Sequence, residues 1–344
     1  MAFEIVATGK AVPSHRISND ELAKTLDTSD EWIRSHTGIG NRHIADEQTA
    51  TSDLAVAAAR EALHLLVDQN PSLEGSMEAA IDSLDLIIVA TASPDFFGCP
   101  STSCLVQDKL GAKNAAAMDV VAGCTGFIYG VETAAGVLNI RQNRKRALVI
   151  GAEILSKITD WNDRSTCVLF GDGAGAAIID KTDAPSSGPG KRGLLRSILG
   201  SDGSGSEHLI MRRGGTRNPY KRGEIIELPP HIEMNGRAVY NFAVKAVTET
   251  MEQLLEEEHI SVDDIARIIP HQANARIVQA AAKRLGIPEE KFFLNIEEYA
   301  NTSSASIPIA LDELNRAGNL KKGDLIMTLG FGAGLTYGGN LIVW

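Results

Sequence analysis

Gly171-Asp-Gly-Ala-Gly175 and Gly330-Phe-Gly-Ala-Gly334 repeat one pattern, G-x-G-A-G, at two places separated by nearly half of this 344-residue chain. An apolar run leads into each copy, Thr166-Cys-Val-Leu-Phe170 into the first and Leu325-Ile-Met-Thr-Leu329 into the second. Short apolar runs bounded by turn residues are typical of buried strands. The repeat therefore predicts a duplicated chain in which each glycine loop joins two strands.

Strand-like runs also occur at residues 85–90 and 265–269, and each precedes a turn that contains proline. These runs alternate with segments that have the apolar spacing of helices, at residues 53–66, 101–110, 124–139, 239–258, 273–285 and 305–316. Such alternation predicts an α/β fold with parallel sheets covered by helices. The Pro-, Gly- and Ser-rich stretch 181–193 is typical of an exposed connection, so we divide the chain into halves at 1–183 and 184–344.

The composition indicates a globular protein. Hydrophobic residues make up 44% and charged residues 22%, which excludes disordered and fibrous classes. No run suits a membrane helix, and the first residues lack the basic-then-apolar order of a signal peptide, so we expect a cytoplasmic protein. The formal net charge of -11 disfavours nucleic acid and anionic lipid as partners, so an anionic ligand would need a local basic patch.

Neither the cysteines nor the glycine loops indicate a metal or nucleotide site. No cysteine belongs to a CxxC pair or lies at zinc spacing from histidine, so we expect free thiols and no bound metal. The glycine loops lack the strand-then-helix context of a dinucleotide site. Residues 201–223 are Gly-rich and basic, and a solvated loop and a mobile flap whose cations hold phosphates are equal alternatives.

Cys124 differs from the other cysteines because small residues surround it, in Val120-Val-Ala-Gly-Cys-Thr-Gly-Phe127. A helix that begins at Cys124 would present unpaired amides and a positive dipole end, which lower a thiol pKa and bind an oxyanion. Three glycines would let this helix pack closely: Gly126, Gly130 and Gly136. The alternative is an inert buried thiol, which we expect for the remaining cysteines.

His271 and Asn301 occupy positions where an α/β fold presents functional groups. His271 follows the apolar run 265–269 and precedes a helical segment, as residues at the carboxyl end of a parallel strand do. Asn301 lies among small polar residues before the segment 305–316, a place that suits an N-cap as well as a catalytic amide.

With these residues the sequence resembles the β-ketoacyl-acyl-carrier-protein synthase III family, the initiating condensing enzymes of type II fatty acid synthesis in the thiolase superfamily. The matching motifs follow one another along almost the whole chain: Thr28-Ser-Asp-Glu-Trp32 with Thr37-Gly-Ile39, Ala122-Gly-Cys-Thr-Gly-Phe127, Asp163-Arg-Ser-Thr166, Phe170-Gly-Asp-Gly-Ala-Gly175, His271-Gln-Ala-Asn274, Asn301-Thr-Ser303 and Gly330-Phe-Gly-Ala-Gly334. The resemblance implies a thiolase-like fold, with duplicated halves that each contribute a five-stranded sheet to a layered αβαβα core, and a homodimer.

The resemblance assigns catalysis to Cys124, His271 and Asn301. Cys124 would take the acyl group of acyl-CoA while the amides of Cys124 and Ala333 hold the oxyanion. His271 and Asn301 would hydrogen-bond the thioester carbonyl of malonyl-acyl carrier protein during loss of CO2, beside the apolar wall of Phe331. The product would be 3-oxoacyl-acyl carrier protein, formed without a metal or redox cofactor.

Contacts to CoA also follow from the resemblance, at Thr28, Trp32, His36, Arg164 and Asn274. Trp32 and Arg164 would enclose the adenine, although a core tryptophan and a surface salt bridge are the alternatives. His36 stands where the family has an arginine for the CoA phosphates. We therefore expect CoA binding to weaken above a pH of about 6.5, where an unperturbed histidine loses its charge.

An acidic carrier protein would dock, by the same resemblance, on Arg276, Lys283 and Arg284. Helical spacing places Arg276 and Lys283 on one face. Lys283 and Arg284 could alternatively compensate the dipole at the helix C terminus. Asn241 replaces a docking lysine of the family, which leaves the strength of docking open.

Cys99 stands where some members have a phenylalanine that closes the acyl pocket across the dimer. The smaller side chain predicts tolerance of primers longer or bulkier than acetyl, and Cys99→Phe should then change the chain-length profile.

Other functions stay open on the sequence alone. A secondary-metabolite relative would prime a polyketide or transfer acyl groups without release of CO2. A papain-like hydrolase also uses Cys, His and Asn and would release free acid, but the duplicated framework argues against that class. A non-catalytic binding module is least favoured because all three catalytic positions are filled.

Overall fold

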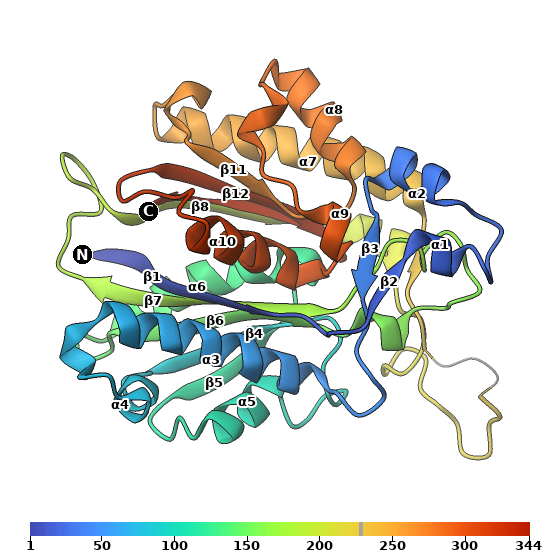
Figure 1. Ribbon diagram of the computed structural model, residues 1–344, viewed down its shortest axis with the longest axis horizontal. Helices are drawn as coiled ribbons and strands as arrows, with labels where there is room; N and C mark the ends of the chain where they lie inside the picture. Colours follow the sequence, from blue (N-terminus) through green and yellow to red (C-terminus); the bar gives the residue numbers. More distant parts are fainter. Residues whose placement is uncertain (227–229) are drawn as a thin grey trace.

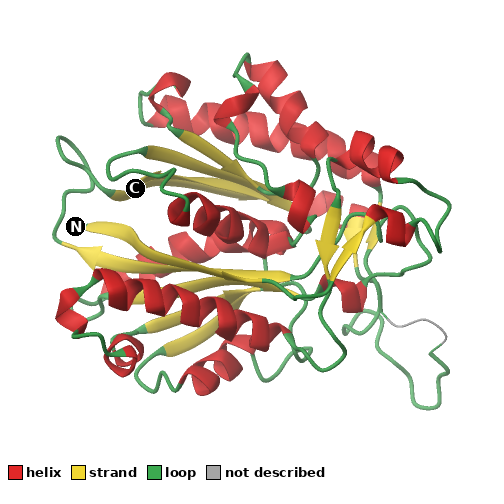
Figure 2. Ribbon diagram, viewed as in Figure 1, coloured by secondary structure: helices red, strands yellow, loops and turns green. Residues whose placement is uncertain are grey.

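In the computed structural model, which describes residues 1–226 and 230–344, two β-sheets alternate with three layers of helices (Figures 1 and 2). The helices are α1 (Asn19–Leu22), α2 (Asp30–Thr37), α3 (Thr51–Gln69), α4 (Met77–Asp82), α5 (Thr102–Leu110), α6 (Gly126–Ile140), α7 (Gly236–Glu257), α8 (Ala275–Leu285), α9 (Ile296–Tyr299) and α10 (Ser306–Arg316). The strands are β1 (Ala2–Ala11), β2 (Arg16–Ser18), β3 (Asn41–His43), β4 (Leu86–Ala90), β5 (Ala116–Val120), β6 (Arg146–Glu153), β7 (Gly173–Thr182), β8 (Gly193–Ser201), β9 (Leu209–Ile210), β10 (Glu233–Met234), β11 (Arg267–Pro270), β12 (Leu325–Gly332) and β13 (Thr336–Val343). Short 3-10 turns are η1 (Pro71–Leu73), η2 (Gly123–Thr125), η3 (Leu155–Ile158), η4 (Gly203–His208), η5 (Val262–Asp264), η6 (Glu289–Lys291) and η7 (Ser303–Ala305).

The first sheet has the strand order β1-β7-β6-β4-β5. β4 pairs in parallel with β5 and β6, whereas β7 runs antiparallel to β6 and to β1. Every residue of β4 and β6 is buried, which explains their apolar sequences. The expectation of purely parallel sheets is wrong. An apolar run indicates that both faces of a strand are buried, and a central strand is buried on both faces whether its neighbours are parallel or antiparallel.

The second sheet has the order β11-β12-β13-β8. β11 and β12 are parallel, whereas β13 runs antiparallel to both β12 and β8. Strands β8, β13, β12 and β11 thus repeat the order and directions of β1, β7, β6 and β4. At the place of β5, the described residues form only an isolated parallel bridge between Ile268 and Phe292. The resemblance implied five strands in this sheet, and that number is wrong, because the described residues form four.

Helices cover both sheets and fill the space between them. α3 packs on the outer face of the first sheet, and α7 and α8 on that of the second. α6 and α10 lie between the sheets, where Phe127 and Leu311 belong to one buried cluster with Ile88 and Ile342 (Figure 1). This arrangement confirms the αβαβα thiolase-like fold. The predicted boundary at 183/184 falls in the connection between Thr182 of β7 and Gly193 of β8, and it stays a prediction.

The two glycine loops differ in structure. The apolar run at 166–170 forms turns rather than the expected strand, and Phe170 makes only an isolated bridge to Asn301. Its apolar character comes from a local cluster, in which Cys167 and Val168 pack with residues that include Ile33. The second run is a true strand, β12, so only the second loop joins two strands of a sheet.

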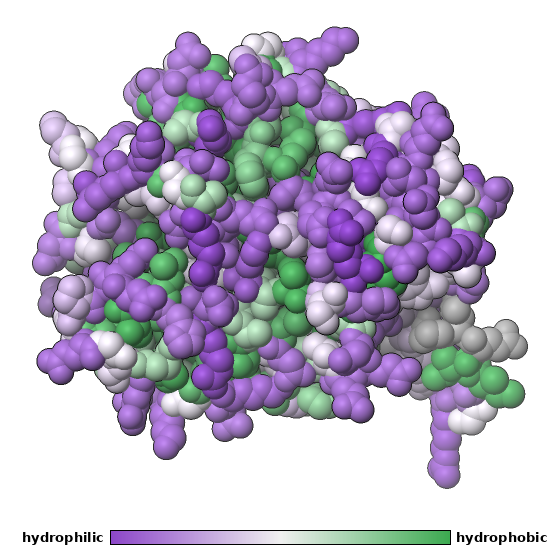
Figure 3. Space-filling model, viewed as in Figure 1, coloured by the Kyte–Doolittle hydropathy of each residue, from purple (hydrophilic) through white to green (hydrophobic). Residues whose placement is uncertain are grey.

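The face drawn in Figure 3 is mainly hydrophilic, with apolar atoms showing between the charged side chains. Among the helices of the described residues, none is both long and apolar enough to span a membrane.

Candidate active site

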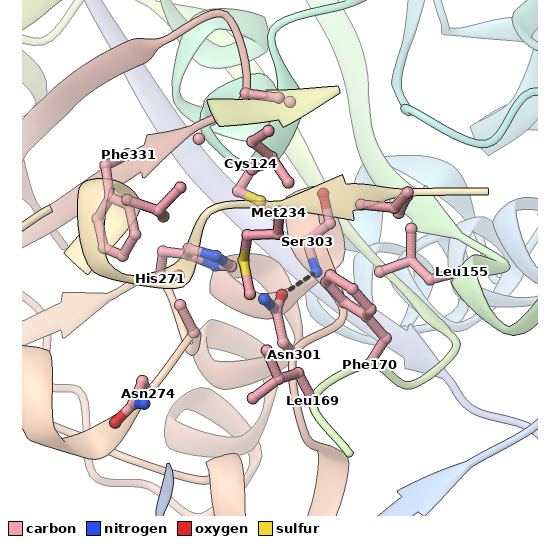
Figure 4. Close-up of a pocket in the computed structure, with 18 of the residues that line it drawn as sticks. Cys124, Leu155, Leu169, Phe170, Met234, His271, Asn274, Asn301, Ser303 and Phe331 are labelled. Atoms are coloured by element: carbon pink, nitrogen blue, oxygen red, sulfur yellow. Dashed lines mark hydrogen bonds between the residues drawn. The ribbon is translucent and has the colours of Figure 1, made fainter. Parts of the chain in front are cut away.

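A cavity of about 330 Å³ opens where the turn η2, the end of β11, the turn η7 and the end of β12 meet. Its lining includes Cys124, His271, Asn301, Phe331 and Ala333. The first three come from distant parts of the sequence, and Figure 4 shows their side chains around one central space. The structure therefore brings the three predicted catalytic side chains together: Cys124 and His271 follow the parallel strands β5 and β11, and Asn301 follows the helix α9.

The nucleophile turn is held close to the end of β12 by two glycines. A Cβ on Gly332 would lie 2.5 Å from the backbone N of Cys124, and a Cβ on Gly123 would lie 2.8 Å from the N of Ala333. Real Cβ atoms do not approach backbone so closely, so only glycine permits this contact. The amides of Cys124 and Ala333 consequently lie at one site, as an oxyanion pocket requires.

The resting state of Cys124 differs from the expectation. Cys124 lies in η2, and the helix α6 begins two residues later, at Gly126. Burial raises the pKa of the Cys124 thiol to about 12; a hydrogen bond with Ser303 lowers it and the charge of Glu153 raises it further. The predicted lowering of the thiol pKa by a helix dipole is therefore outweighed by desolvation, and Cys124 would need a base to act as a nucleophile.

Glu153 is a buried carboxyl group that the sequence analysis did not single out. Its oxygens accept hydrogen bonds from the hydroxyls of Ser93 at 2.6 Å and Ser304 at 2.8 Å, and from the backbone N of Ala92 at 3.0 Å. Burial raises its pKa while these hydrogen bonds oppose the rise. Glu153 thereby ties the end of β4 to the turn η7, and its only sequence signal is a charge at the end of an apolar run.

His271 is buried and neutral at physiological pH. Only 2% of the residue is exposed, and burial lowers its pKa to about 3. Its Nδ1 lies 2.7 Å from the hydroxyl of Ser306, which can donate to Nδ1 or accept from it. Nε2 can therefore serve as acceptor or as donor. The ring of Phe331 packs edge-on at 5.4 Å and gives this side of the cavity an apolar wall.

Asn301 is fixed by backbone and side-chain hydrogen bonds. Its backbone N donates to Leu169, and its backbone O accepts from Gly171. Its side-chain Oδ1 accepts from the backbone N of Ser303 at 2.8 Å (Figure 4). Since Oδ1 is occupied, the amide group that remains is a donor. His271 and Asn301 can thus present two donors to one carbonyl oxygen.

The predicted CoA residues fall into two groups. His36 and Asn274 line the cavity, and the side-chain N of Asn274 donates to the backbone O of His36 at 3.1 Å. Trp32 and Arg164 lie outside the cavity lining, with the Arg164 guanidinium 5.0 Å from the centre of the Trp32 ring. An aromatic ring between them needs about 3.5 Å on each side, so Arg164 would have to move outward.

Two observations add to this region. The His36 ring stacks on Trp32 at 4.4 Å, so the residue that replaces arginine makes an aromatic contact. The hydroxyl of Thr28 is buried and has no hydrogen-bond partner among the described residues. A buried hydroxyl without a partner is costly, and a ligand at this place would satisfy it.

The predicted docking cations lie on the exposed face of α8. The side chains of Arg276, Lys283 and Arg284 form no ion pair within residues 1–226 and 230–344. Asn241 on the neighbouring α7 is also exposed, and Arg237 lies one turn before it. This basic surface contrasts with the net charge of -11 for the whole chain.

The basic segment 201–223 contributes to the cavity through apolar residues, because Leu209, Ile210 and Met211 line it. Arg212 pairs with Glu207 and Glu233, and Arg213 pairs with Glu224. Carboxylates thus already neutralise two of the cations that a phosphate-holding flap would use.

Cys99 is exposed and lies outside the cavity lining of its own chain. Because the expected role concerns the pocket of a partner chain, it stays a prediction.

A layered αβαβα fold and a cavity that unites a cysteine, a histidine and an asparagine define a thiolase-fold condensing enzyme. Two family profiles match the chain: 3-oxoacyl-[acyl-carrier-protein (ACP)] synthase III at residues 118–203, and the C-terminal part of the same enzyme at residues 255–344. The beta-ketoacyl-[acyl-carrier-protein] synthase III of Natranaerobius thermophilus is 48% identical over 341 residues, which are 99% of each protein.

Solved structures agree with these matches. The 3-oxoacyl-[acyl-carrier-protein] synthase III of Aquifex aeolicus VF5 has a TM-score of 0.87 and 40% identity, with 100% of both chains covered. The priming beta-ketosynthase of the R1128 polyketide biosynthetic pathway has a TM-score of 0.85 and 32% identity over 99% of this chain and 96% of that chain. The chain belongs to the 3-oxoacyl-[acyl-carrier-protein] synthase III family, whose members are condensing acyltransferases.

Proposed function

We propose that this enzyme condenses an acyl-CoA primer with malonyl-acyl carrier protein, giving 3-oxoacyl-acyl carrier protein, CO2 and CoA, and so initiates type II fatty acid synthesis. The observation that carries this proposal is the single cavity in which Cys124 faces His271 and Asn301. The full-length match to relatives named beta-ketoacyl-[acyl-carrier-protein] synthase III supports it.

In the first half-reaction, the neutral imidazole of His271 accepts the thiol proton of Cys124 through Nε2. The thiolate sulfur attacks the thioester carbonyl, and the amides of Cys124 and Ala333 stabilise the oxyanion. The carbon–sulfur bond to CoA then breaks, and the departing CoA thiolate takes the proton. An acyl-Cys124 intermediate remains.

In the second half-reaction, malonyl-acyl carrier protein replaces CoA. Before this step the ring proton of neutral His271 exchanges from Nδ1 to Nε2, and the Ser306 hydroxyl turns from acceptor to donor at Nδ1. His271 Nε2–H and the amide of Asn301 then donate to the thioester oxygen, which gains charge when the bond to the carboxylate breaks and CO2 leaves. Phe331 offers that carboxylate no hydrogen bond, which favours its loss. The carbanion attacks the acyl group, and Cys124 departs as a thiolate that takes one proton from solvent, the proton that the overall reaction consumes.

The partners follow from this reaction. Both substrates carry a phosphopantetheine thioester, and the exposed cations of α8 suit an acidic carrier protein. We infer from the family that the enzyme is a cytoplasmic homodimer. We also infer a reaction without metal or redox cofactor, because a thiol, an imidazole and amide groups provide the nucleophile, the base and the hydrogen-bond donors that the reaction needs. Acyl-CoA is a substrate here rather than a cofactor.

Intact-protein mass spectrometry tests the proposal. Wild type and Cys124→Ala are mixed with a ladder of acyl-CoAs, and malonyl-acyl carrier protein with a labelled carboxyl group is then added. We expect an acyl adduct on wild type alone, discharged as labelled CO2 and 3-oxoacyl product form. Transfer of the acyl group without CO2 would support an acyl-transferring relative, and free acid would support a hydrolase.

A further inference from the structure

A half-buried polar cluster lies outside the cavity and is connected to His271 and Asn301, the two residues that hold the malonyl thioester in the proposed mechanism. Its centre is Glu313 on α10, whose Oε1 accepts from the Nζ of Lys10 at 2.6 Å and from the hydroxyl of Tyr299 at 2.5 Å. Its Oε2 accepts from the side-chain N of Asn295 at 2.8 Å. One carboxylate therefore joins the strand β1 to both ends of the helix α9.

The first arm of the cluster leads to Asn301. Tyr299 ends α9, and only Ala300 separates it from Asn301. Ala300 has a φ of 56°, in the left-handed region that side chains rarely adopt. Such a backbone conformation persists only where the surroundings fix it from several sides. The Tyr299 hydroxyl, held by Glu313 and by Lys10 at 2.8 Å, is one of these fixed points.

The second arm leads to His271. The backbone N of Asn295 donates to the side-chain O of Gln272 at 3.1 Å, and Gln272 directly follows His271. The other side-chain atom of Gln272 donates to the backbone O of Pro270 at 2.8 Å, at the end of β11. Glu313 is therefore linked through Asn295 to the backbone on both sides of His271.

The protonation states of Glu313 and Tyr299 keep the hydrogen bond between them intact at neutral pH. Burial would raise the pKa of Glu313, but hydrogen bonds from Lys10, Tyr299 and Asn295 lower it below its usual range. Burial and its hydrogen bond to Glu313 raise the pKa of Tyr299. Glu313 is thus a carboxylate and Tyr299 a neutral donor at neutral pH, so their hydrogen bond persists.

We propose that Glu313 is a positioning residue that sets the separation of Asn301 and His271, with Tyr299 as the arm that acts on Asn301 and Asn295 as the arm that acts on His271. The inference rests on the proposed condensation, in which the donors of Asn301 and His271 must reach one oxygen atom. Asn301 acts only in the second half-reaction, whereas His271 acts in both. The two arms should therefore have different kinetic effects.

The test measures both half-reactions of the full-length enzyme in Tyr299→Phe and Asn295→Ala. Tyr299→Phe keeps the ring that stacks on His43 at 5.6 Å and removes only the hydroxyl. We expect CO2 release from malonyl-acyl carrier protein to slow about tenfold, while Cys124 acylation stays within about twofold and the KM for malonyl-acyl carrier protein is unchanged. Asn295→Ala should slow both half-reactions.

Arg16→Gln is the matched control, because it breaks an exposed ion pair with Glu298, the neighbour of Tyr299 on α9, and leaves the cluster intact. Both rates of this control should equal those of wild type. Equal losses of both rates in Tyr299→Phe, or a lower melting temperature with unchanged rates, would overturn the inference. Wild type that releases no CO2 would instead refute the proposed condensation, and the inference with it.

Discussion

Cys124 and His271, to which we assign catalysis, are both uncharged in the resting enzyme. Burial raises the pKa of Cys124 to about 12 and lowers that of His271 to about 3. A thiolate–imidazolium pair, as in papain-like proteases, is therefore not the ground state. In the proposed mechanism, the proton therefore moves only as the substrate carbonyl accepts the sulfur, and the oxyanion pocket provides the stabilisation that the free thiolate lacks.

The first prediction concerns the reactivity of Cys124. With a pKa near 12, the thiolate fraction rises about tenfold per pH unit throughout the range from about pH 6 to 9. The iodoacetamide alkylation rate, followed by intact mass, should rise in parallel without a plateau. Since the Glu153 charge opposes the thiolate, Glu153→Gln should raise the rate at every pH. A plateau below about pH 8 would instead show an activated thiolate.

The second prediction concerns acid stability. The pKa of His271 is about 3 in the folded protein, below its ordinary value of 6.5, so the unfolded chain binds this proton more tightly. The free energy of unfolding should thus fall as pH drops from 6.5 toward 3, by up to about 1.4 kcal/mol per pH unit. Urea midpoints measured from pH 7 to about pH 5 should fall less in His271→Asn than in wild type. His64→Gln, on the exposed face of α3, is the control and should follow wild type.

Sequence patterns could locate the three side chains that meet in the cavity but not the residues that hold them. Cys124, His271 and Asn301 lie in short motifs of small or polar residues next to apolar runs, so local sequence reveals them. Ser306 contacts His271 across 35 residues, and Glu313 contacts Lys10 across 303. The first pair meets only when the second half folds, and the second pair only when the two halves pack, so a single sequence carries no local signal for either.

At the scale of elements, the glycines of α6 show that a glycine in the sequence does not by itself predict close packing. Gly126 and Gly130 do pack closely, since a Cβ on either would lie 2.8 Å from Ala90 or Val149. A Cβ on Gly136 would have no heavy atom within 4 Å among the residues that the structure describes, so the expected packing role of Gly136 is wrong. The prediction of a strand at 166–170 is wrong for a similar reason. Cys167 and Val168 are buried as expected, but they pack against neighbouring helices and not within a sheet.

The third prediction follows from this contrast. Gly136→Ala should stabilise the protein by about 1 kcal/mol, because alanine favours a helix interior and meets no neighbour here. Gly130→Ala should destabilise it by about 1–3 kcal/mol through contact with Val149. Urea unfolding of both variants beside wild type measures the difference. Equal effects of the two substitutions would contradict the packing seen around α6.

At the scale of the whole molecule, the two sheets differ at one edge. The first sheet ends in β5, whereas the corresponding place in the second sheet has the single bridge at Phe292. Large apolar side chains near β5 are exposed, with Val121 at 79%, Phe97 at 58% and Phe96 at 54%. An open strand edge beside exposed apolar side chains is typical of a protein–protein interface.

The last prediction is that a second copy of this chain covers that edge. Closed symmetry requires a self-complementary surface, and an antiparallel pairing of β5 with its own copy provides one. Light scattering after size-exclusion chromatography should give twice the 36.7 kDa of the chain. Val121→Asp would place a charge in the dimer interface and should shift the mass toward a single chain, while Ile140→Asp, equally exposed at the far end of α6, should not. Because the loop with Cys99 leads into α5 beside β5, the separated chains should also lose the primer chain-length preference of the dimer.

A single-chain mass for wild type, or a dimer that survives Val121→Asp unchanged, would assign the exposed apolar residues to another role.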